Sequence, residues 1–510
     1  MKRILAAVAG VAAAGLVLTS CASGGDGAAA DGGQSNAPSE LKVGNFLDLV
    51  TWDPSAADIG FNGPYLSAVY DPLIALDGEG QPVPALATGW EVSDDSLTIT
   101  MDIRDDAEFS NGEKLDADAV VENLEFLQTG IVSQEAYLNV DGFEAVDADT
   151  VEIRMKKRDD RLLYFMGLGR SYMIAPSVIE AGTAAEAPVG SGPYTLSDAT
   201  VPGAEYRFDK VAGHWAADEF AFDTVTIVPL QDPAARLNAM EAGQVNVIFA
   251  DASMLSTAES NGWSVARKIA SWAGLRINDH TGSQVPALGD ERVRQALNYA
   301  FDGASLLDTV AQGLGEPSRQ VFAVGYPGYD GAIDERYAFD MAKAKQLLAD
   351  AGYADGFEIA MPMAPAFQPW QPIVEQTFGE LGIRLTWDEY QMADYQSNAG
   401  TYPMFIVSLA VDSDPVATIA RQLTVPQWYN PEPDISEFPE LQAQVDAALA
   451  APRGDEQNAE IVELNEMITD AGWFVPWYQS DNVFLTDPGI ELTPVTGMMF
   501  PTLRQIRPAG

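Results

Sequence analysis

The sequence predicts an α/β protein with mixed sheets that folds into at least two lobes. Segments in which every second residue is apolar alternate with segments in which apolar residues recur every three or four positions. A chain of 510 residues is also longer than one hydrophobic core normally accommodates. Its content of 47% hydrophobic and 9% aromatic residues is typical of globular proteins with large cores.

The chain begins like a secretory leader. Two basic residues precede an apolar stretch, residues 4–18, which is too short to cross a hydrocarbon core of about 30 Å. The only cysteine ends the tetrapeptide Leu18-Thr19-Ser20-Cys21, which resembles a bacterial lipobox. We therefore predict a lipoprotein signal peptide at residues 1–20 and a diacylglycerol anchor on Cys21. An ordinary leader with an incidental cysteine is the alternative.

The segment that follows is a predicted tether. Residues 22–39 contain no large apolar side chain, so they cannot bury enough surface to offset the entropy lost on ordering. We expect residues 21–40 to connect the lipid anchor flexibly to a folded body at the outer face of the cell membrane. Once Cys21 is lipidated, no thiol remains for a disulfide or for nucleophilic catalysis.

Hydrophobic periodicity places the main elements. Apolar residues that alternate or form short runs predict strands at 96–104, 151–155, 224–228 and 245–249. Helical spacing predicts helices at 290–309, 340–351, 441–451 and 455–471. Asp340 occupies the N-cap position of the second helix, and Gly352 its C-terminal stop. Proline restricts the preceding residue, so turns or element ends are predicted at Asp53-Pro54, Asp71-Pro72, Asp232-Pro233, Asp414-Pro415 and Asp487-Pro488.

The balance of charge excludes nucleic acid as a partner. Lysine and arginine number 28, and aspartate and glutamate 75, which gives a formal net charge of −47. Such a chain has no means of neutralising a phosphate backbone. The acidic residues are spread along the chain, which favours a role in solubility, for example in a salty habitat. Attraction of cationic ligands is the alternative interpretation.

Residues that could support catalysis or a metal centre are scarce. His214 and His280 are the only histidines, and we interpret both as surface or loop residues. Neither a Gly-x-Ser-x-Gly motif nor a phosphate-binding Gly-x-x-x-x-Gly-Lys motif occurs. We therefore expect a binding protein without catalytic residues, bound metal or other cofactor. A secreted hydrolase stays open as an alternative, because carboxylate pairs are abundant in this chain.

Several blocks of sequence follow the order found in one family. They are 69–74 (VYDPLI), 84–92 (PALATGWEV), 103–113 (IRDDAEFSNGE), 188–194 (PVGSGPY), 293–302 (VRQALNYAFD) and 343–353 (KAKQLLADAGY). In these blocks the chain resembles the extracellular solute-binding proteins, family 5, of bacterial ABC importers, a family that includes oligopeptide-, dipeptide- and nickel-binding proteins. Ser191 replaces the threonine that is usual in the fourth block.

The resemblance implies a two-lobe periplasmic-binding-protein-like clamp of type II, in its large variant with an extra subdomain in lobe I. Lobe I would comprise residues 41–60, 190–275 and 478–510, the extra subdomain 61–189, and lobe II 276–477. A ligand would bind in the cleft between the lobes, and closure about the two crossovers of the chain would bury it.

The resemblance also implies the function. The protein would act as a monomer that captures peptides and delivers them to an ABC permease in the membrane. An oligosaccharide or another small solute is the alternative ligand within the same family.

One acidic segment of lobe II contains the main candidate ligand contact. Peptide-binding relatives have an aspartate shortly before an acidic-Pro step, and it pairs with the α-ammonium of the ligand. By resemblance Asp412, which precedes Asp414 and Pro415, takes this role. Such a charged hydrogen bond contributes roughly 1.5–3 kcal/mol when water is excluded. A turn aspartate is the alternative.

Aromatic residues are further candidates for the cleft. Trp428, Tyr429 and Trp370 lie in proline-rich segments that fit no helical core stripe. Trp272 lies near the first crossover, where packing at the hinge is the alternative to ligand contact. Aromatic faces suit peptide side chains and sugar rings equally well, so these residues do not decide the ligand.

The remaining candidates are charged or follow the first strand. Arg421 is a candidate partner for a ligand carboxylate, with an exposed arginine as the alternative. By resemblance, Asp48 and Leu49 would line the cleft from the side of lobe I.

Overall fold

Two large hydrophobic cores divide the residues that the computed structural model describes, 39–57 and 59–509, into two lobes. Core 1, in lobe I, gathers buried side chains between Leu41 and Val247 with others near the C-terminus, among them Phe500. Core 2, in lobe II, gathers buried side chains between Trp272 and Tyr478. The prediction of an α/β protein with mixed sheets and two lobes is thus confirmed. The lobe boundaries given above stay predictions.

The strands of the largest sheet run through both lobes. They are β1 (Glu40–Asn45), β8 (Tyr194–Leu196), β9 (Tyr206–Lys210), β10 (Thr224–Pro229), β11 (Val247–Ala250), β12 (Ser264–Ile277), β13 (Gly315–Pro317), β16 (Met404–Ala410) and β17 (Phe474–Thr486). The order is β16-β12-β17-β11-β1-β10-β9-β8, with β13 paired to β17 beside that path. β1 is parallel to β10 and β11, whereas β12 is antiparallel to β16 and β17.

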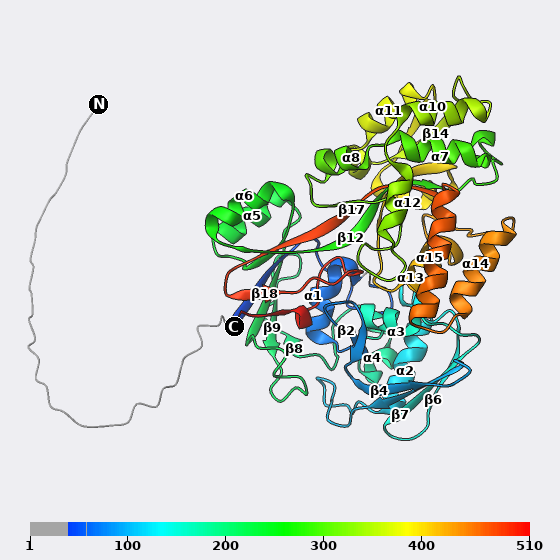
Figure 1. The fold of residues 1–510 in the computed structure, drawn as a ribbon. Coiled ribbons are helices and arrows are strands. Elements are labelled where there is room, and N and C mark those ends of the chain that lie inside the picture. The colour runs from blue at the N-terminus through cyan, green and yellow to red at the C-terminus, as the bar shows by residue number, and fades with distance from the viewer. Residues whose placement is uncertain (1–38, 58, 510) are drawn as a thin grey trace, which may run out of the picture. The chain divides into compact units, whose positions relative to one another are not determined.

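The long strands β12 and β17 connect the lobes. At one end β17 pairs with β11 of lobe I from Val483 to Thr486, and β12 pairs with the same residues of β17. At the other end β12 pairs with β16 of lobe II from Ser271 to Ile277. Figure 1 shows the two strands running side by side from the region of α5 (Pro233–Glu241) and α6 (Leu255–Asn261) towards the helices of lobe II.

The helices of lobe II surround core 2. They are α7 (Glu291–Ala300), α8 (Gly303–Val310), α9 (Gly331–Asp334), α10 (Met341–Asp350), α11 (Gln371–Glu380), α12 (Met392–Asn398), α13 (Pro415–Ile419), α14 (Pro439–Ala450) and α15 (Asp455–Asp470). Two further strands, β14 (Glu358–Met363) and β15 (Arg384–Glu389), form a parallel pair.

A four-stranded antiparallel sheet characterises the predicted extra subdomain. Its order is β4-β5-β7-β6, and its strands are β4 (Ala87–Val92), β5 (Thr98–Ile103), β6 (Val140–Ala145) and β7 (Thr150–Met155). The hairpin strands nearby are β2 (Ile74–Leu76) and β3 (Pro82–Pro84). The helices are α2 (Ala117–Gln128), α3 (Leu162–Phe165) and α4 (Pro176–Ala181), with the short turns η1 (Ser133–Ala136) and η2 (Met166–Arg170).

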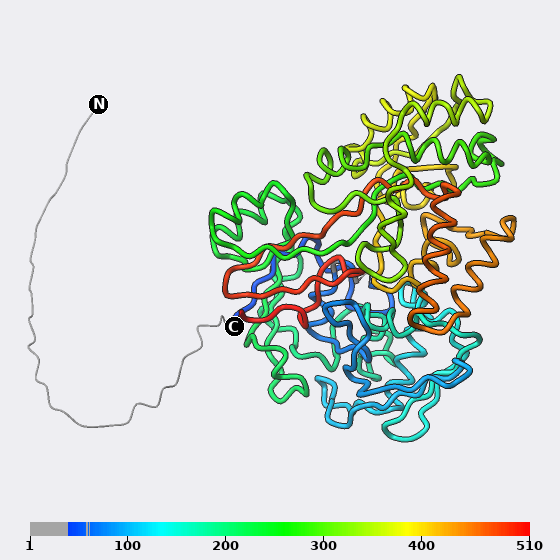
Figure 2. Tube along the Cα trace, in the orientation of Figure 1, coloured from blue at the N-terminus to red at the C-terminus, as the bar shows by residue number. Residues whose placement is uncertain are grey.

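The C-terminal segment returns to lobe I. It contains β18 (Ile490–Leu492), the turn η9 (Leu503–Gln505) and β19 (Ile506–Pro508), and it packs on α1 (Ile59–Val69). The backbone N–H of Leu503 donates to Ser67 Oγ on that helix, at 3.1 Å. Figure 2 shows this red segment next to the blue N-terminal part of lobe I.

The predicted elements are largely confirmed. Strands β5, β7, β10 and β11 and helices α10, α14 and α15 lie within two or three residues of the predicted ranges. Asp340 caps α10 by accepting from the backbone N–H of Lys343. Asp232 and Asp414, each followed by proline, cap α5 and α13.

One helix prediction was wrong. The predicted helix 290–309 is two helices, because the backbone is extended at Phe301 and the side chain of Asp302 caps α8 by accepting from the backbone N–H of Ser305. The predicted leader and tether lie outside the described residues, apart from residues 39 and 40. Within the described part of the chain, no helix has the length and hydropathy to cross a membrane.

Candidate ligand cleft

The end of strand β16 positions the acidic segment of lobe II between the lobes. The carboxylate of Asp414 accepts hydrogen bonds from the backbone N–H groups of Val416 and Ala417, at 2.9 and 3.1 Å, and thereby caps α13. Pro415 at the first helical position needs no hydrogen bond for its nitrogen. This local geometry leaves Asp412 in the turn before the helix, where only 3% of the residue is exposed.

Asp412 belongs to a buried group of polar side chains that joins the two lobes. Its Oδ1 atom accepts from Arg421 Nη1 at 2.7 Å and from the hydroxyl of Tyr164 at 3.2 Å. Glu135 Oε1 in turn lies 3.3 Å from Arg421 Nη2 and 2.9 Å from Arg170 Nη2. We call these five residues the inner cluster. Glu135 forms an ion pair with Arg170 and another with Arg421, and none of these three side chains is more than 21% exposed.

The electrostatics of the inner cluster differ from residue to residue. Burial raises the pKa of Asp412 to about 6, although the nearby Arg421 acts in the opposite direction. Burial would also raise the pKa of Glu135, but Arg421 and Arg170 outweigh it and lower that pKa to about 2. Burial and the neighbouring Asp412 raise the pKa of Tyr164 well above its ordinary value, so its hydroxyl stays a hydrogen-bond donor.

A second polar group joins the lobes nearer to solvent. Arg453 Nη2 lies 2.7 Å from Asp414 Oδ2, and Arg453 Nε lies 3.9 Å from Asp160 Oδ2. Arg158 pairs with the same Asp160 and donates through Nη1 to the backbone carbonyl of Ala450 at 3.0 Å. Gln457 adds a hydrogen bond to Asp160 at 3.2 Å. These residues form what we call the outer cluster.

A groove of about 760 Å³ is lined by residues from both lobes beside these clusters. Its lobe I wall includes Asn139, Arg158 and Arg161, and its lobe II wall includes Leu423 and Leu449. The ring of Phe165 contacts Arg161 of the groove and Arg421 of the inner cluster, whose guanidinium carbons lie 5.7 and 4.8 Å from its centroid. A space of this size, bounded by both lobes, is adequate for a small solute.

The aromatic candidates occupy different environments. Trp272 is fully buried in core 2, where its ring centroid lies 5.8 Å from that of Phe474. Trp370 precedes α11 and donates through Nε1 to the hydroxyl of Tyr478 at 3.0 Å. Trp428 is half-buried and packs edge-on against the buried Tyr429, with 5.3 Å between centroids.

The structure brings some of the other predicted site residues together and not others. Arg421, for which an exposed position was the alternative, is largely buried and pairs with Asp412. Asp48 instead accepts from the hydroxyl of Tyr206 at 2.9 Å and from the backbone N–H of Leu49 at 2.8 Å. Within the described residues, no hydrogen bond or ion pair connects Asp48 or Leu49 to the inner cluster.

Three members of the inner cluster were not predicted from the sequence. Glu135 lies on η1, Tyr164 on α3 and Arg170 at the end of η2. None belongs to a motif, and Tyr164 lies 248 positions before Asp412 in the sequence. In the sequence these three residues differ from their neighbours only in being polar, which is a weak indication of a binding site.

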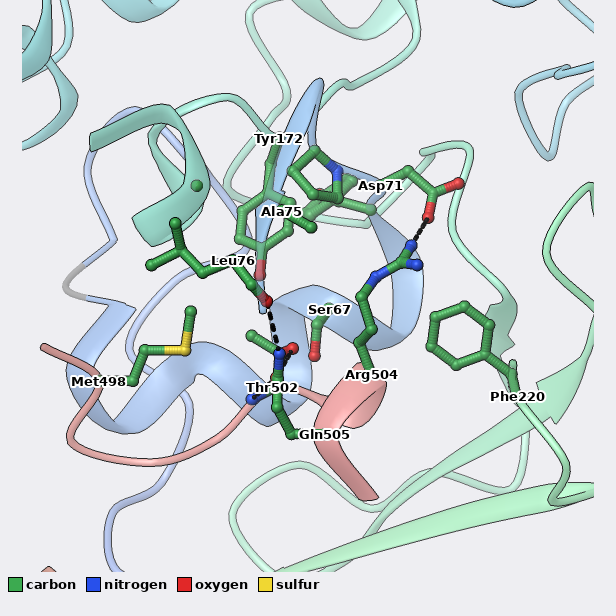
Figure 3. Close-up of a pocket in the computed structure, with 13 residues that line it drawn as sticks. Ser67, Asp71, Ala75, Leu76, Tyr172, Phe220, Met498, Thr502, Arg504 and Gln505 are labelled. Atoms are coloured by element: carbon green, nitrogen blue, oxygen red, sulfur yellow. Dashed lines mark hydrogen bonds and ion pairs between the residues drawn. The ribbon is translucent and has the colours of Figure 1, made fainter. Parts of the chain in front are cut away.

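A smaller cavity lies inside lobe I and has a different character. It has a volume of about 20 Å³ and is lined by Ser67, Asp71 and Arg504 among others (Figure 3). Asp71 Oδ2 accepts from Trp215 Nε1 at 2.8 Å and lies 2.9 Å from His214 Nε2. This volume suits about one water molecule, so the cavity belongs to the packing of lobe I.

Both histidines lie in loops but are buried. His214 contacts Asp71, and His280 stacks on Trp473 with 3.7 Å between ring centroids. Burial lowers the pKa of His280 to about 3, so its imidazole is neutral at pH 7. Within residues 39–57 and 59–509, no group of three or more histidine, cysteine, aspartate or glutamate side chains has the arrangement of a metal site.

Comparison with known proteins identifies the family. The family model for bacterial extracellular solute-binding proteins, family 5, matches residues 81–430, and the chain belongs to that family. Heme-binding protein A of Haemophilus influenzae is 26% identical over 446 residues, which cover 76% of this chain and 78% of that protein. The glutathione-binding protein GsiB of Salmonella paratyphi A is 26% identical over 351 residues, or 66% of this chain and 67% of that protein.

Solved structures establish the fold independently. The ABC transporter-associated periplasmic binding protein DppA of Helicobacter pylori, in complex with the peptide STSA, superimposes with a TM-score of 0.76 at 17% identity. The match covers 92% of this chain and 98% of that protein. The predicted two-lobe clamp of the periplasmic-binding-protein type is therefore confirmed, and the relatives named here are binding proteins.

Proposed function

We propose that this protein captures peptides between its two lobes and delivers them to an ABC permease in the membrane. The inner cluster is the observation that carries this proposal, because it concentrates buried charges of both signs where the lobes meet. A peptide has an α-ammonium and a carboxylate. These groups can take the place of a cation or an anion of the inner cluster, so that no buried ion is left unpaired. The similarity to a glutathione-binding relative supports the same class of ligand.

Within this proposal, Asp412 receives the α-ammonium of the peptide. Its carboxylate is held by Arg421 and Tyr164, so a ligand ammonium must be accommodated beside these partners or replace one of them. The half-buried Trp428 and Trp370 are proposed to contact side chains of the ligand. Strands β12 and β17, which run from one lobe to the other, would allow the lobes to close about the ligand.

The first test is thermal unfolding of the purified protein with di- to penta-peptides, oligosaccharides, opines and nickel. A ligand at 100 times its dissociation constant adds about 2.7 kcal/mol to the free energy of unfolding, which raises Tm measurably. We expect the rise with peptides and its loss in Asp412→Asn. Asp308→Asn, at an exposed position of lobe II, is the matched control and should respond as the wild type does. A rise with oligosaccharides alone would contradict peptide binding.

We also propose that the protein is a lipoprotein of the outer face of the cell membrane, anchored through Cys21. The proposal rests on the lipobox-like tetrapeptide at the end of the apolar leader. Two or three acyl chains anchor a protein stably, since each buried CH₂ contributes about 0.8 kcal/mol. Cys21→Ala should be released into the medium, as measured by fractionation and immunoblotting. Retention of this variant in the membrane would contradict the anchor.

A further inference from the structure

The carboxylate of Glu135 lies between two arginines that come from different lobes. Arg170 approaches Glu135 Oε1 with two nitrogens, Nε at 3.2 Å and Nη2 at 2.9 Å, and belongs to lobe I. Arg421 Nη2 lies 3.3 Å from the same oxygen and belongs to lobe II. Glu135 itself extends from a short turn of lobe I. Its side chain therefore provides the lobe I carboxylate that pairs with Arg421.

The side chain of Arg421 and the backbone of Arg170 have contacts that do not involve Glu135. Asp412 pairs with Arg421 Nη1, and the ring of Phe165 lies against the guanidinium of Arg421. The backbone carbonyl of Arg170 accepts from the hydroxyl of Tyr137. If Glu135 were withdrawn, two guanidinium groups would remain with only Asp412 to balance them. The place that Glu135 occupies would then attract another anion.

One donor in this place has no partner even when Glu135 is present. Arg170 is only 7% exposed, and its buried Nη1 atom has no hydrogen-bond partner among the described residues. A buried guanidinium nitrogen without an acceptor is costly. Glu135 thus pairs with the charge of Arg170 but leaves one of its donors without an acceptor, and a carboxylate that replaced Glu135 would have this donor available.

We propose that Arg170 and Arg421 form a carboxylate-binding subsite, which Glu135 fills until a solute carboxylate displaces it. We call this the two-arginine subsite. The proposal rests on the proposed function, in which a solute binds between the lobes. Because the subsite has one arginine from each lobe, a carboxylate in it links the lobes whether it comes from Glu135 or from the solute. Glu135 is therefore an internal competitor that lowers the affinity for carboxylate-bearing solutes.

The first test uses acetate to replace the missing side-chain carboxylate. Glu135→Ala removes two carbons and two oxygens, and acetate has the same two carbons and the same charged group. We expect Glu135→Ala to lower Tm, and sodium acetate to restore most of the loss in a saturable manner. Acetamide and sodium chloride at equal ionic strength are expected to have no such effect. The double variant Glu135→Ala/Arg170→Gln should lose the response to acetate.

Glu358→Ala is the matched control for this experiment. Glu358 pairs with Arg384 at an exposed position of lobe II, where the two side chains are 78% and 62% exposed. Acetate should leave the Tm of this variant unchanged, since no buried pair of arginines holds a carboxylate there. An equal response of Glu358→Ala, or no response of Glu135→Ala, would overturn the two-arginine subsite.

The second test separates competition from a purely structural role. Glu135→Gln keeps the shape of the side chain and removes its charge, so the competitor is weakened while the fold is kept. We expect it to bind the free dipeptide Ala-Ala several-fold more tightly than the wild type, and Ala-Ala amide with unchanged affinity, in isothermal titration calorimetry. Weaker binding of Ala-Ala by this variant would overturn the competition.

The two proposals fail in distinguishable ways. Acetate recovery of Glu135→Ala needs no natural ligand, so it tests the subsite even if no peptide binds. Peptide binding without acetate recovery would leave the capture function standing and remove the subsite. Acetate recovery together with glycan binding alone would keep the subsite and overturn the peptide proposal.

Discussion

The inner and outer clusters both connect lobe I to lobe II, but they differ in their exposure to solvent. In the inner cluster the side chain of Asp412 is 2% exposed and that of Arg421 is 16% exposed. In the outer cluster the side chain of Arg453 is 45% exposed, although that of its partner Asp414 is only 8% exposed. Distances alone do not separate the two, because the shortest ion pairs of Arg421 and of Arg453 are both 2.7 Å. Burial, and not distance, therefore distinguishes the arginine of the inner cluster from that of the outer cluster.

The largest expected effect comes from removing the shared cation of the inner cluster. Arg421→Met keeps an unbranched apolar side chain but removes the guanidinium, and it leaves Asp412 and Glu135 buried without this partner. Removing one member of a buried ion pair costs about 3–5 kcal/mol, because the other charge stays uncompensated. Denaturant unfolding at pH 7 measures this loss. Arg384→Met, at an exposed pair, is the control and should change the free energy of unfolding by at most about 0.5 kcal/mol.

A loss as small as that of Arg384→Met would mean that water enters the inner cluster and screens it as it screens the outer one. Recovery of stability in the double variant Arg421→Met/Asp412→Leu would instead show that the cost of Arg421→Met comes from the unpaired carboxylate, since replacing a buried pair with apolar groups is often tolerated.

The next largest expected effect is the pH dependence of the stability that Glu135 contributes. The pKa of Glu135 is lowered to about 2 in the folded protein, so its contribution to stability is present above its ordinary pKa and is lost as pH falls towards 2. The difference in unfolding free energy between the wild type and Glu135→Gln should therefore be constant near neutrality and shrink below about pH 4.5, by about 1.4 kcal/mol at pH 3.5 and by about 3 kcal/mol near pH 2. Unfolding of both proteins between pH 7 and pH 3.5 measures it. A difference that grows in acid would contradict this account.

A smaller effect is expected from one hydroxyl of the inner cluster. Tyr164→Phe removes the group that donates to Asp412 at 3.2 Å and accepts from the backbone N–H of Ser413 at 3.3 Å. The variant leaves this buried N–H without its partner, at a cost of about 1–2 kcal/mol. Thermal unfolding detects the change, and Tyr353→Phe, at a half-buried position of lobe II, is the control. No change in Tyr164→Phe would show that these hydrogen bonds contribute little.

The sequence predicts the elements better than it predicts the cluster, and the reason is physical. Strands such as β5 and helices such as α10 follow from periodicity and from caps, which act over a few residues. The break between α7 and α8 was missed because Phe301 continues the apolar spacing while Asp302 begins a new helix. The capping residue Asp302 lies within a continuous apolar pattern, so the pattern alone does not show that a second helix begins there.

The candidate site depends on contacts that no local pattern encodes. Asp412 and Arg421 lie nine positions apart, and both were candidates, but their pairing was not predicted. Their partners Glu135 and Tyr164 come from lobe I, more than 240 positions away in the sequence. Whether a charged residue is exposed or paired is decided when the lobes meet, so a single sequence gives the chemical type of the residue without its partner.

The smallest effect is expected at the outer cluster. Arg453→Gln removes the cation between Asp414 and Asp160, but Arg158 and Gln457 still contact Asp160. Because this side chain is 45% exposed and the buried Asp414 keeps its hydrogen bonds from the backbone of α13, the substitution should cost at most about 1 kcal/mol, and salt at about 1 M should reduce that cost further. Unfolding of the wild type, Arg453→Gln and Arg421→Met at low and high salt measures both clusters together. If salt diminished the effect of Arg421→Met as strongly as that of Arg453→Gln, burial would not be what distinguishes the inner cluster.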